Sequence, residues 1–176
     1  MNRRLWLTRI VKGFTLTGAG FIAYPFFRAL IPVGGNDASL EVKVDDLKPG
    51  QSKIVHWRGR DLVVQKRSAQ MISTIEEGDI DLKDPASAKS SQPGFAENQY
   101  RSLRPEIFVT YNLCTHLGCQ VTESTDSRLG FSCPCHQSDY DLSGRVVSGA
   151  AAPTNLEIPN YRFISGNTLL LEQIDT

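Results

Sequence analysis

The feature that most constrains this chain is the gathering of its sulfur and imidazole side chains in one short stretch. All four cysteines and two of the three histidines of the 176 residues lie between positions 114 and 136. They form a C-x-H-x-x-C group at 114–119 and a C-x-C-H group at 133–136. Thiolates and imidazoles at these spacings give two chelating loops, as a metal centre with mixed sulfur and nitrogen ligands requires.

More than one kind of site is compatible with these residues. A structural zinc site needs four ligands in a closed tetrahedron, and one cysteine and one histidine from each group would supply them. Zinc would leave Cys119 and Cys135 unexplained. Disulfide bridges alone allow three pairings of four cysteines, but they ignore both histidines. A two-iron two-sulfur centre in which two histidines replace two cysteines on one iron is the third possibility.

Both groups resemble the cluster loops of the Rieske iron–sulfur family, which read C-T-H-x-G-C and C-P-C-H-x-S. This chain reads C-T-H-L-G-C at 114–119 and C-P-C-H-Q-S at 133–138, so it matches every ligand position. The resemblance implies one [2Fe-2S] cluster per chain, with two thiolates on a buried iron and two imidazoles on an outer iron. The implied ligands are Cys114 and Cys133 on the buried iron, and His116 and His136 on the outer iron.

The same resemblance implies roles for five neighbouring residues. A disulfide between Cys119 and Cys135 would tie the two loops together. Ser138 and Tyr140 occupy positions whose hydroxyls bind cluster-associated sulfur, and such hydrogen bonds raise the reduction potential because they stabilise the reduced state. Leu117 would be an exposed apolar contact for a quinol pocket. An ordinary turn serine, a strand tyrosine and a leucine packed beneath its loop are the alternative interpretations.

Two positions depart from the family pattern. Gln137 stands where a glycine is common, and residues 150–153 read A-A-A-P where G-P-A-P is common. A glycine at position 137 would serve a positive φ or a close backbone approach, which glutamine accepts less readily. The change at 150–153 removes a proline that would stiffen a third loop, which covers the cluster. Neither departure affects an implied ligand.

The charge of the ligand set connects this site to function. An oxidised two-iron two-sulfide core has two positive charges, so two thiolates leave the centre neutral whereas four would make it doubly negative. Rieske centres accordingly have potentials of roughly −150 to +300 mV, against about −400 mV for plant-type clusters with four cysteines. That range allows electrons to be taken from quinols.

The first 33 residues are predicted to target and anchor the protein. Residues 1–12 are basic, and R-R-L-W-L at 3–7 resembles a twin-arginine export motif. Residues 13–33 are mostly apolar and long enough to cross a bilayer, which takes roughly 20 residues. Basic residues before the span predict a cytoplasmic amino terminus and a periplasmic remainder. A simple basic flank and a cleaved signal peptide are the alternatives.

Beyond the predicted anchor, the small polar residues 34–39 are typical of a flexible tether. Residues 40–176 are of a length usual for one domain. The charges of these residues are nearly balanced and they contain no basic patch, so nothing indicates nucleic-acid binding. An oxidising compartment such as the periplasm is also where a disulfide would persist.

Alternating patterns and turn residues predict a mainly β head. His56 falls within one predicted strand and is interpreted as a strand residue with a partner, not as a ligand. Residues 78–105 are polar and loop-rich, and we expect them to wrap the domain or meet a partner. The predicted strands are 40–44, 54–57, 62–64, 106–113, 156–163 and 168–172, with a turn at 58–60, another at 166–167 and a helix at 69–77.

The resemblance implies a fold and a place within the family. It implies a single N-terminal transmembrane helix and a Rieske-type antiparallel β-sandwich head, with a cluster-binding subdomain inserted at about 113–153. The extra cysteine pair and the anchor resemble the Rieske subunit of a bacterial quinol:cytochrome c oxidoreductase, the cytochrome bc complex. A Rieske subunit of another periplasmic redox enzyme, such as an arsenite oxidase, and a zinc-stabilised anchor protein without redox function remain alternatives.

The implied mechanism involves a histidine that meets the substrate. His136, or less favourably His116, would accept a hydrogen bond and a proton from quinol at cytochrome b. Movement of the head would then bring the electron to a c-type cytochrome haem, and release of the proton to the periplasm would contribute to proton translocation. The implied setting is a dimeric multisubunit complex in a bacterial inner membrane, which the chain would span once.

Overall fold

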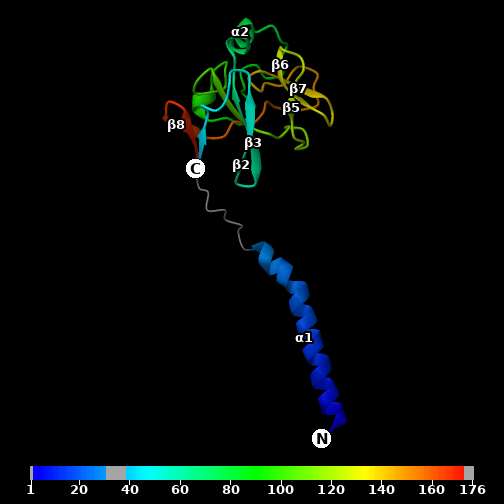
Figure 1. The fold of residues 1–176 in the computed structure, drawn as a ribbon. Helices are drawn as coiled ribbons and strands as arrows, with labels where there is room; N and C mark the ends of the chain where they lie inside the picture. The colour runs from blue at the N-terminus through cyan, green and yellow to red at the C-terminus, as the bar shows by residue number, and fades with distance from the viewer. Residues whose placement is uncertain (1, 31–38, 173–176) are drawn as a thin grey trace. The chain divides into compact units, whose positions relative to one another are not determined.

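The computed structural model describes residues 2–30 and 39–172, and the chain divides into two compact units, 1–36 and 37–176 (Figure 1). The first unit contains one long helix, α1 (Arg3–Leu30). Within the described ranges, α1 is the one helix that is long and apolar enough to cross a membrane, and none of its residues is buried. Its 28 residues rise about 42 Å, more than the roughly 30 Å of a bilayer's hydrocarbon core.

The helix begins earlier than the apolar run does. Arginine, lysine and leucine all favour helices, so the basic residues predicted as a separate segment at 1–12 continue into α1 from Arg3. The hydroxyls of Thr15 and Thr17 donate to carbonyls four residues earlier, which satisfies their polar atoms within the helix. The end of the predicted span, 31–33, lies outside the described residues.

The predicted tether at 34–39 also falls outside the described residues, except for its last member. Ser39 is the first residue of strand β1 and pairs with Glu172.

In its described residues, 39–172, the head has three antiparallel three-stranded sheets, which confirms the prediction of a mainly β fold. One core of buried apolar side chains draws on all three sheets, with Leu171, Val64 and Phe131 as examples. The first sheet has the order β1 (Ser39–Lys43), β9 (Thr168–Glu172), β8 (Tyr161–Ser165); the second β2 (Ser52–Trp57), β3 (Arg60–Lys66), β4 (Ile107–Tyr111); the third β5 (Thr122–Glu123), β6 (Leu129–Cys133), β7 (Ser138–Asp141).

Strands β2 and β3 form the predicted hairpin. Arg58 and Gly59 make its two-residue turn with φ of 53° and 75°, and positive φ at both positions is what a type I′ hairpin turn needs. His56 lies on β2, where its Nδ1 is 2.8 Å from Asp61 Oδ1 on β3. The histidine therefore has the strand position and the partner that were expected.

The helix α2 (Ala69–Glu77) has the predicted bounds. Ser68 caps it by accepting a hydrogen bond from the Met71 amide, and Gly78 ends it in the left-handed conformation with φ of 67°. These signals are local in sequence, which is why the helix could be predicted.

The predicted strand at 156–163 is wrong in its first half, because β8 begins only at Tyr161. The amide of Leu156 donates to Gly144 and that of Ile158 donates to Ser91, both in loops. Pro159 has no amide hydrogen to give to a ladder. Residues 156–160 therefore form no regular strand ladder, although the oxygens of Glu157 and Asn160 accept hydrogen bonds from Tyr111 and Glu172, which lie in strands.

The segment between α2 and β4, predicted at 78–105 to wrap the domain or meet a partner, packs onto the rest of the head. It contains one short 3₁₀ helix, η1 (Gly94–Ala96). The guanidinium of buried Arg101 donates to the main-chain oxygens of Ser143, Gly144 and Leu156. These bonds tie the segment to residues that follow β7.

Candidate metal centre

Two loops carry the predicted ligands. The first loop follows β4, and the second is the tight connection between β6 and β7, because β6 ends at Cys133 and β7 begins at Ser138. The amide of Cys114 donates to the oxygen of Cys119 at 2.7 Å, and the amide of Gly118 donates to the oxygen of Cys114 at 2.9 Å. These bonds fold the first loop into a compact turn.

The four cysteines divide into two pairs. Cys119 and Cys135 form a disulfide, the pairing that the resemblance implied, with their Cα atoms 6.6 Å apart. Cys114 and Cys133 are free thiols and only 3% and 2% exposed. The sulfur of Cys133 lies within 4.8 Å of both disulfide sulfurs. Since disulfide sulfurs are not thiolates, the sulfurs left to hold a metal are those of Cys114 and Cys133.

The two histidines of the loops lie against each other. The ring centroids of His116 and His136 are 4.7 Å apart with the rings at 80°. The Nδ1 atom of His116 is buried and has no hydrogen-bond partner, which is costly for a polar atom unless a ligand satisfies it. His136 is exposed. Two buried thiols, a paired set of imidazoles and one orphaned ring nitrogen fit a centre with two sulfur and two nitrogen ligands.

Tyr140 contacts the first loop from β7. Its hydroxyl oxygen is 3.2 Å from the sulfur of Cys114 and accepts a hydrogen bond from the Thr115 amide at 3.3 Å. Burial raises the pKa of Tyr140, and the hydrogen bond to Cys114 raises it further, while Thr115 opposes both effects. The hydroxyl therefore stays protonated and able to donate to sulfur.

Ser138 joins the second loop to the third. Its side chain is fully buried, and its Oγ accepts a hydrogen bond from the Ala152 amide at 3.0 Å. The hydroxyl proton of Ser138 thus remains for another acceptor. The third loop is also bound to the first, because Thr115 Oγ1 donates to the oxygen of Thr154 at 2.6 Å.

Gln137 has the backbone conformation for which a glycine would be suited. Its φ is 53°, in the left-handed region, and its amide donates to the oxygen of Cys133 at 3.0 Å. An L residue other than glycine costs about 1–2 kcal/mol in this region. The second loop therefore keeps the conformation that the departure from the family pattern put in question, and it does so with backbone strain.

Leu117 is 71% exposed, so the alternative in which it packs beneath the loop is wrong. Pro134 and His136 of the second loop are exposed as well.

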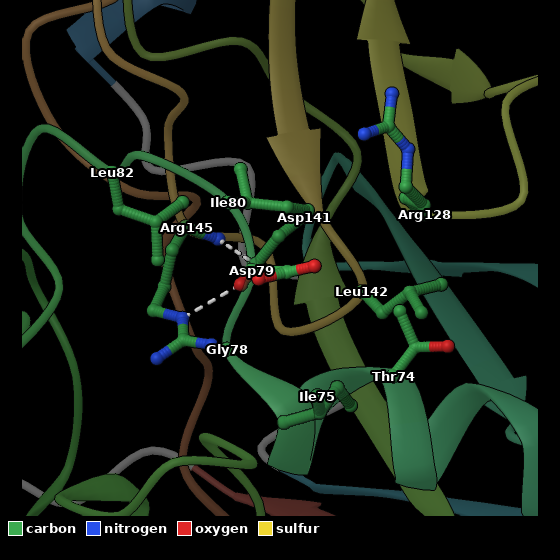
Figure 2. A pocket seen from close by; sticks show the side chains of 10 residues that line it. All are labelled: Thr74, Ile75, Gly78, Asp79, Ile80, Leu82, Arg128, Asp141, Leu142 and Arg145. Atoms are coloured by element: carbon green, nitrogen blue, oxygen red, sulfur yellow. Dashed lines mark hydrogen bonds and ion pairs between the residues drawn. The ribbon is translucent and has the colours of Figure 1, made fainter.

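The turn after β7 is fixed by an ion pair that the sequence did not point to. The carboxylate of Asp141 accepts hydrogen bonds from the amides of Ser143 and Arg145 at 2.8 and 2.7 Å. The Nε of Arg145 lies 2.7 Å from the same carboxylate, and both side chains line a small pocket beside α2 (Figure 2). This turn holds the end of the strand that bears Ser138 and Tyr140.

Two further contacts with the loops were also not predicted. Asp61 accepts a hydrogen bond from Gln120, next to the disulfide, at 3.0 Å. Lys83 donates to the main-chain oxygens of Ala150 and Ala152 in the third loop. No sequence pattern could have found these contacts, because their partners are 59 to 69 residues apart.

Comparison with known proteins identifies the family of this chain. A family model described as "Rieske [2Fe-2S] domain" matches residues 39–162. The "Ubiquinol-cytochrome c reductase iron-sulfur subunit" of Allochromatium vinosum is 36% identical, over 97% of this chain and 88% of the relative. The "Cytochrome b-c1 complex subunit Rieske-1, mitochondrial" of Nicotiana tabacum is also 36% identical, over 90% of this chain, which spans about three fifths (61%) of that relative.

A solved structure shares the fold. One chain of a "Hyperthermophilic respiratory Complex III" superposes with a TM-score of 0.50 at 21% identity, over 90% of this chain and 97% of that one. The family model covers more than half of the sequence and includes both cysteine–histidine loops. This chain belongs to the Rieske [2Fe-2S] family.

Proposed function

We propose that this chain is the iron–sulfur subunit of a quinol:cytochrome c reductase, where it takes an electron from quinol and passes it to a c-type cytochrome. The proposal rests on one observation: the two loops carry two buried free thiols and two imidazoles that lie against each other, one of them with an orphaned Nδ1. The relative from Allochromatium, which is named as such a subunit and aligns with nearly the whole chain, supports it.

In this proposal the cluster is held by Cys114, His116, Cys133 and His136. When bound, it supplies one-electron chemistry in a range of potentials that quinols can reduce. The protein excludes water from the two cysteines by burying them. The disulfide between Cys119 and Cys135 holds the two ligand loops together. Tyr140 and Ser138 offer hydroxyl protons from the buried side of the site.

His136 is the proposed contact for the substrate. Its side chain is exposed whereas His116 is partly covered, so a quinol hydroxyl has freer access to His136. The imidazole would accept the hydrogen bond and hold the proton while the electron enters the protein. Leu117, exposed on the neighbouring loop, would provide an apolar contact with the wall of the quinol pocket.

The proposed partners are a cytochrome b and a c-type cytochrome in a dimeric membrane complex. The helix α1 would anchor the chain in a bacterial cell membrane, with the basic residues near its start on the cytoplasmic side. The head would face the periplasm, an oxidising compartment in which the disulfide persists. The proposed division is 1–12 basic terminus, 13–33 anchor, 34–39 hinge and 40–176 head, with the cluster subdomain at about 113–153.

Metal analysis of two histidine variants tests the ligand set. The full chain purified from membranes should contain iron and acid-labile sulfide near two each per chain, with a rhombic electron-spin signal when reduced. His136→Gln should lose the cluster, whereas His56→Gln should keep it, since His56 is an exposed strand residue bonded to Asp61. Stoichiometric zinc in a colourless protein would contradict the proposal.

Co-purification and turnover test the role in the complex. The chain should copurify with b- and c-type haem. Leu117→Ala should lower the rate of quinol oxidation without changing the cluster spectrum. Ile164→Ala is the control. It shortens an exposed apolar side chain on β8, outside the ligand loops, and should leave turnover unchanged. Equal rates in the two variants would remove Leu117 from the proposed contact.

Transfer between two partners requires the head to visit both, and the proposed hinge rests on the sequence alone. Replacing Gly34 and Gly35 with proline should leave the cluster and complex assembly intact while slowing electron arrival at the c haem. Flash or stopped-flow kinetics would separate cluster reduction from haem reduction. Full turnover in this variant would place the hinge elsewhere or make movement unnecessary.

A further inference from the structure

Lys83 makes a side-chain contact with the third loop that the family motifs do not include. Its Nζ donates to the oxygen of Ala150 at 2.7 Å and to that of Ala152 at 2.9 Å. Lys83 belongs to the segment between α2 and β4, far from the third loop in sequence. Lys83 is exposed, and hydrogen bonds from an ionised donor are stronger than neutral ones, so the ammonium links these two parts of the head.

Main-chain pairing brings Lys83 to this position. Leu82 and Val147 form an antiparallel bridge, and the Lys83 amide donates to the oxygen of Val146 at 2.9 Å. The backbone of the segment thus runs beside the residues that lead into the third loop. From this position the lysine side chain reaches the main-chain oxygens of Ala150 and Ala152.

The third loop is held by its main chain, by the burial of Ala152 and by the Thr115 bond to Thr154. Ala150, Ala151 and Ala152 have only methyl side chains, so the polar contacts of the loop itself are made by its main chain. The peptide groups of Ala152 are bound on both sides, since its amide donates to Ser138 Oγ and its oxygen accepts from Lys83. Ala152 itself is fully buried. A shift of Ala152 would therefore distort the hydrogen bond between its amide and Ser138 Oγ.

We infer that Lys83 is a positioning residue, which holds the third loop against the ligand loops and thereby fixes the direction of the Ser138 hydroxyl. The inference rests on the proposed function, in which Ser138 donates toward the cluster. While the Ala152 amide donates to Ser138 Oγ, the hydroxyl proton of Ser138 is directed away from that amide. When the loop loosens, that proton is free to turn away, and the reduction potential falls.

Lys83→Met tests this in the full chain, because methionine has a similar length and no donors. Amides of residues 149–154 should exchange with solvent about tenfold faster, as expected for the loss of hydrogen bonds to a charged group. Amides of the core strand β4 should exchange at the wild-type rate. The reduction potential should shift downward, and Lys83→Arg, which keeps a charged donor, should restore both properties.

Lys48→Met is the matched control, since it removes the same charge from an exposed lysine between β1 and β2. It should change neither loop exchange nor potential. Wild-type exchange of the third loop in Lys83→Met would overturn the inference, even if the potential moved, because charge alone would then explain the shift. Metal analysis keeps the two proposals apart: a zinc-containing protein would refute the function while the exchange data still report on Lys83.

Discussion

The hydroxyl oxygen of Tyr140 lies 3.2 Å from the sulfur of Cys114, and both side chains are buried. This contact joins β7, which follows the second loop, to the first residue of the first loop. A buried neutral hydroxyl beside a thiolate ligand stabilises negative charge on that ligand. Since reduction adds negative charge to the centre, the contact should favour the reduced state.

Tyr140→Phe should lower the reduction potential while the cluster remains. If the hydrogen bond contributes about 1.5 kcal/mol to the reduced state, the shift is about 60 mV for one electron. Potentiometric titration followed by electron-spin resonance would measure it. Tyr100→Phe is the control, because the Tyr100 hydroxyl bonds Glu76 at the surface, away from the ligand loops. Equal potentials in the wild type and Tyr140→Phe would mean that the hydroxyl does not donate to Cys114.

Ser138→Ala should lower the potential in the same direction. The change removes the hydroxyl proton and also the acceptor of the Ala152 amide, so a modest loss of stability should accompany it. Spectra of the purified full chain should show the cluster still bound. A stability loss without any change in potential would assign Ser138 to holding the third loop only.

Gln137→Gly should stabilise the protein. Glutamine at φ of 53° is strained, and glycine relieves that strain but adds freedom to the unfolded chain. The net gain should be about 0.5–1 kcal/mol in the free energy of unfolding, measured by denaturant titration in detergent. Gly118→Ala provides the reverse case, because Gly118 has φ of 75° in the first loop and should tolerate alanine poorly. A loss of stability in Gln137→Gly would show that the glutamine side chain makes a compensating contact.

Removal of the disulfide should weaken cluster retention. The bridge between Cys119 and Cys135 has a sequence separation of 16, for which chain-entropy estimates give roughly 3 kcal/mol. The double alanine variant should lose iron faster on heating than the wild type does, and the wild type under strong thiol reductant should approach the variant. Identical iron loss in all three samples would show that the loops hold together without the bridge.

Tyr161 should make the head sensitive to alkaline pH. Burial raises the pKa of Tyr161 to about 12, although the Leu103 amide, Arg67 and Arg104 oppose the shift. The raised pKa of this acid means that its contribution is fully present below the unfolded pKa near 10 and is lost as the pH rises toward 12. Two pKa units correspond to about 3 kcal/mol at most.

Tyr161→Phe should remove that alkaline loss. The variant gives up the hydrogen bond from the Leu103 amide and should be somewhat less stable at pH 8. Urea unfolding at several pH values between 9 and 12 should show the difference between wild type and variant shrinking as the pH rises. A difference that stays constant would contradict the raised pKa.

Local sequence determined several parts of this protein. The two ligand loops could be predicted from the sequence, because a metal centre requires particular donor residues at short spacings. The hairpin turn at Arg58 and Gly59, and the helix α2 between Ser68 and Gly78, depend on cap and turn residues within a few positions. An apolar run of sufficient length likewise predicted α1. In each case the determining interaction lies within the segment itself.

Only the tertiary structure decided how distant segments support the site. The stretch 156–160 has a strand-like pattern, but its amides are taken by loops from elsewhere in the chain. Lys83 gives no sign in the sequence that it reaches Ala150 and Ala152. The sequence left open how Gln137 fits a position where glycine is common. In the structure Gln137 has a positive φ in the connection between β6 and β7. The contacts of Lys83 and Ile158 depend on partners dozens of residues away, so local patterns do not encode them.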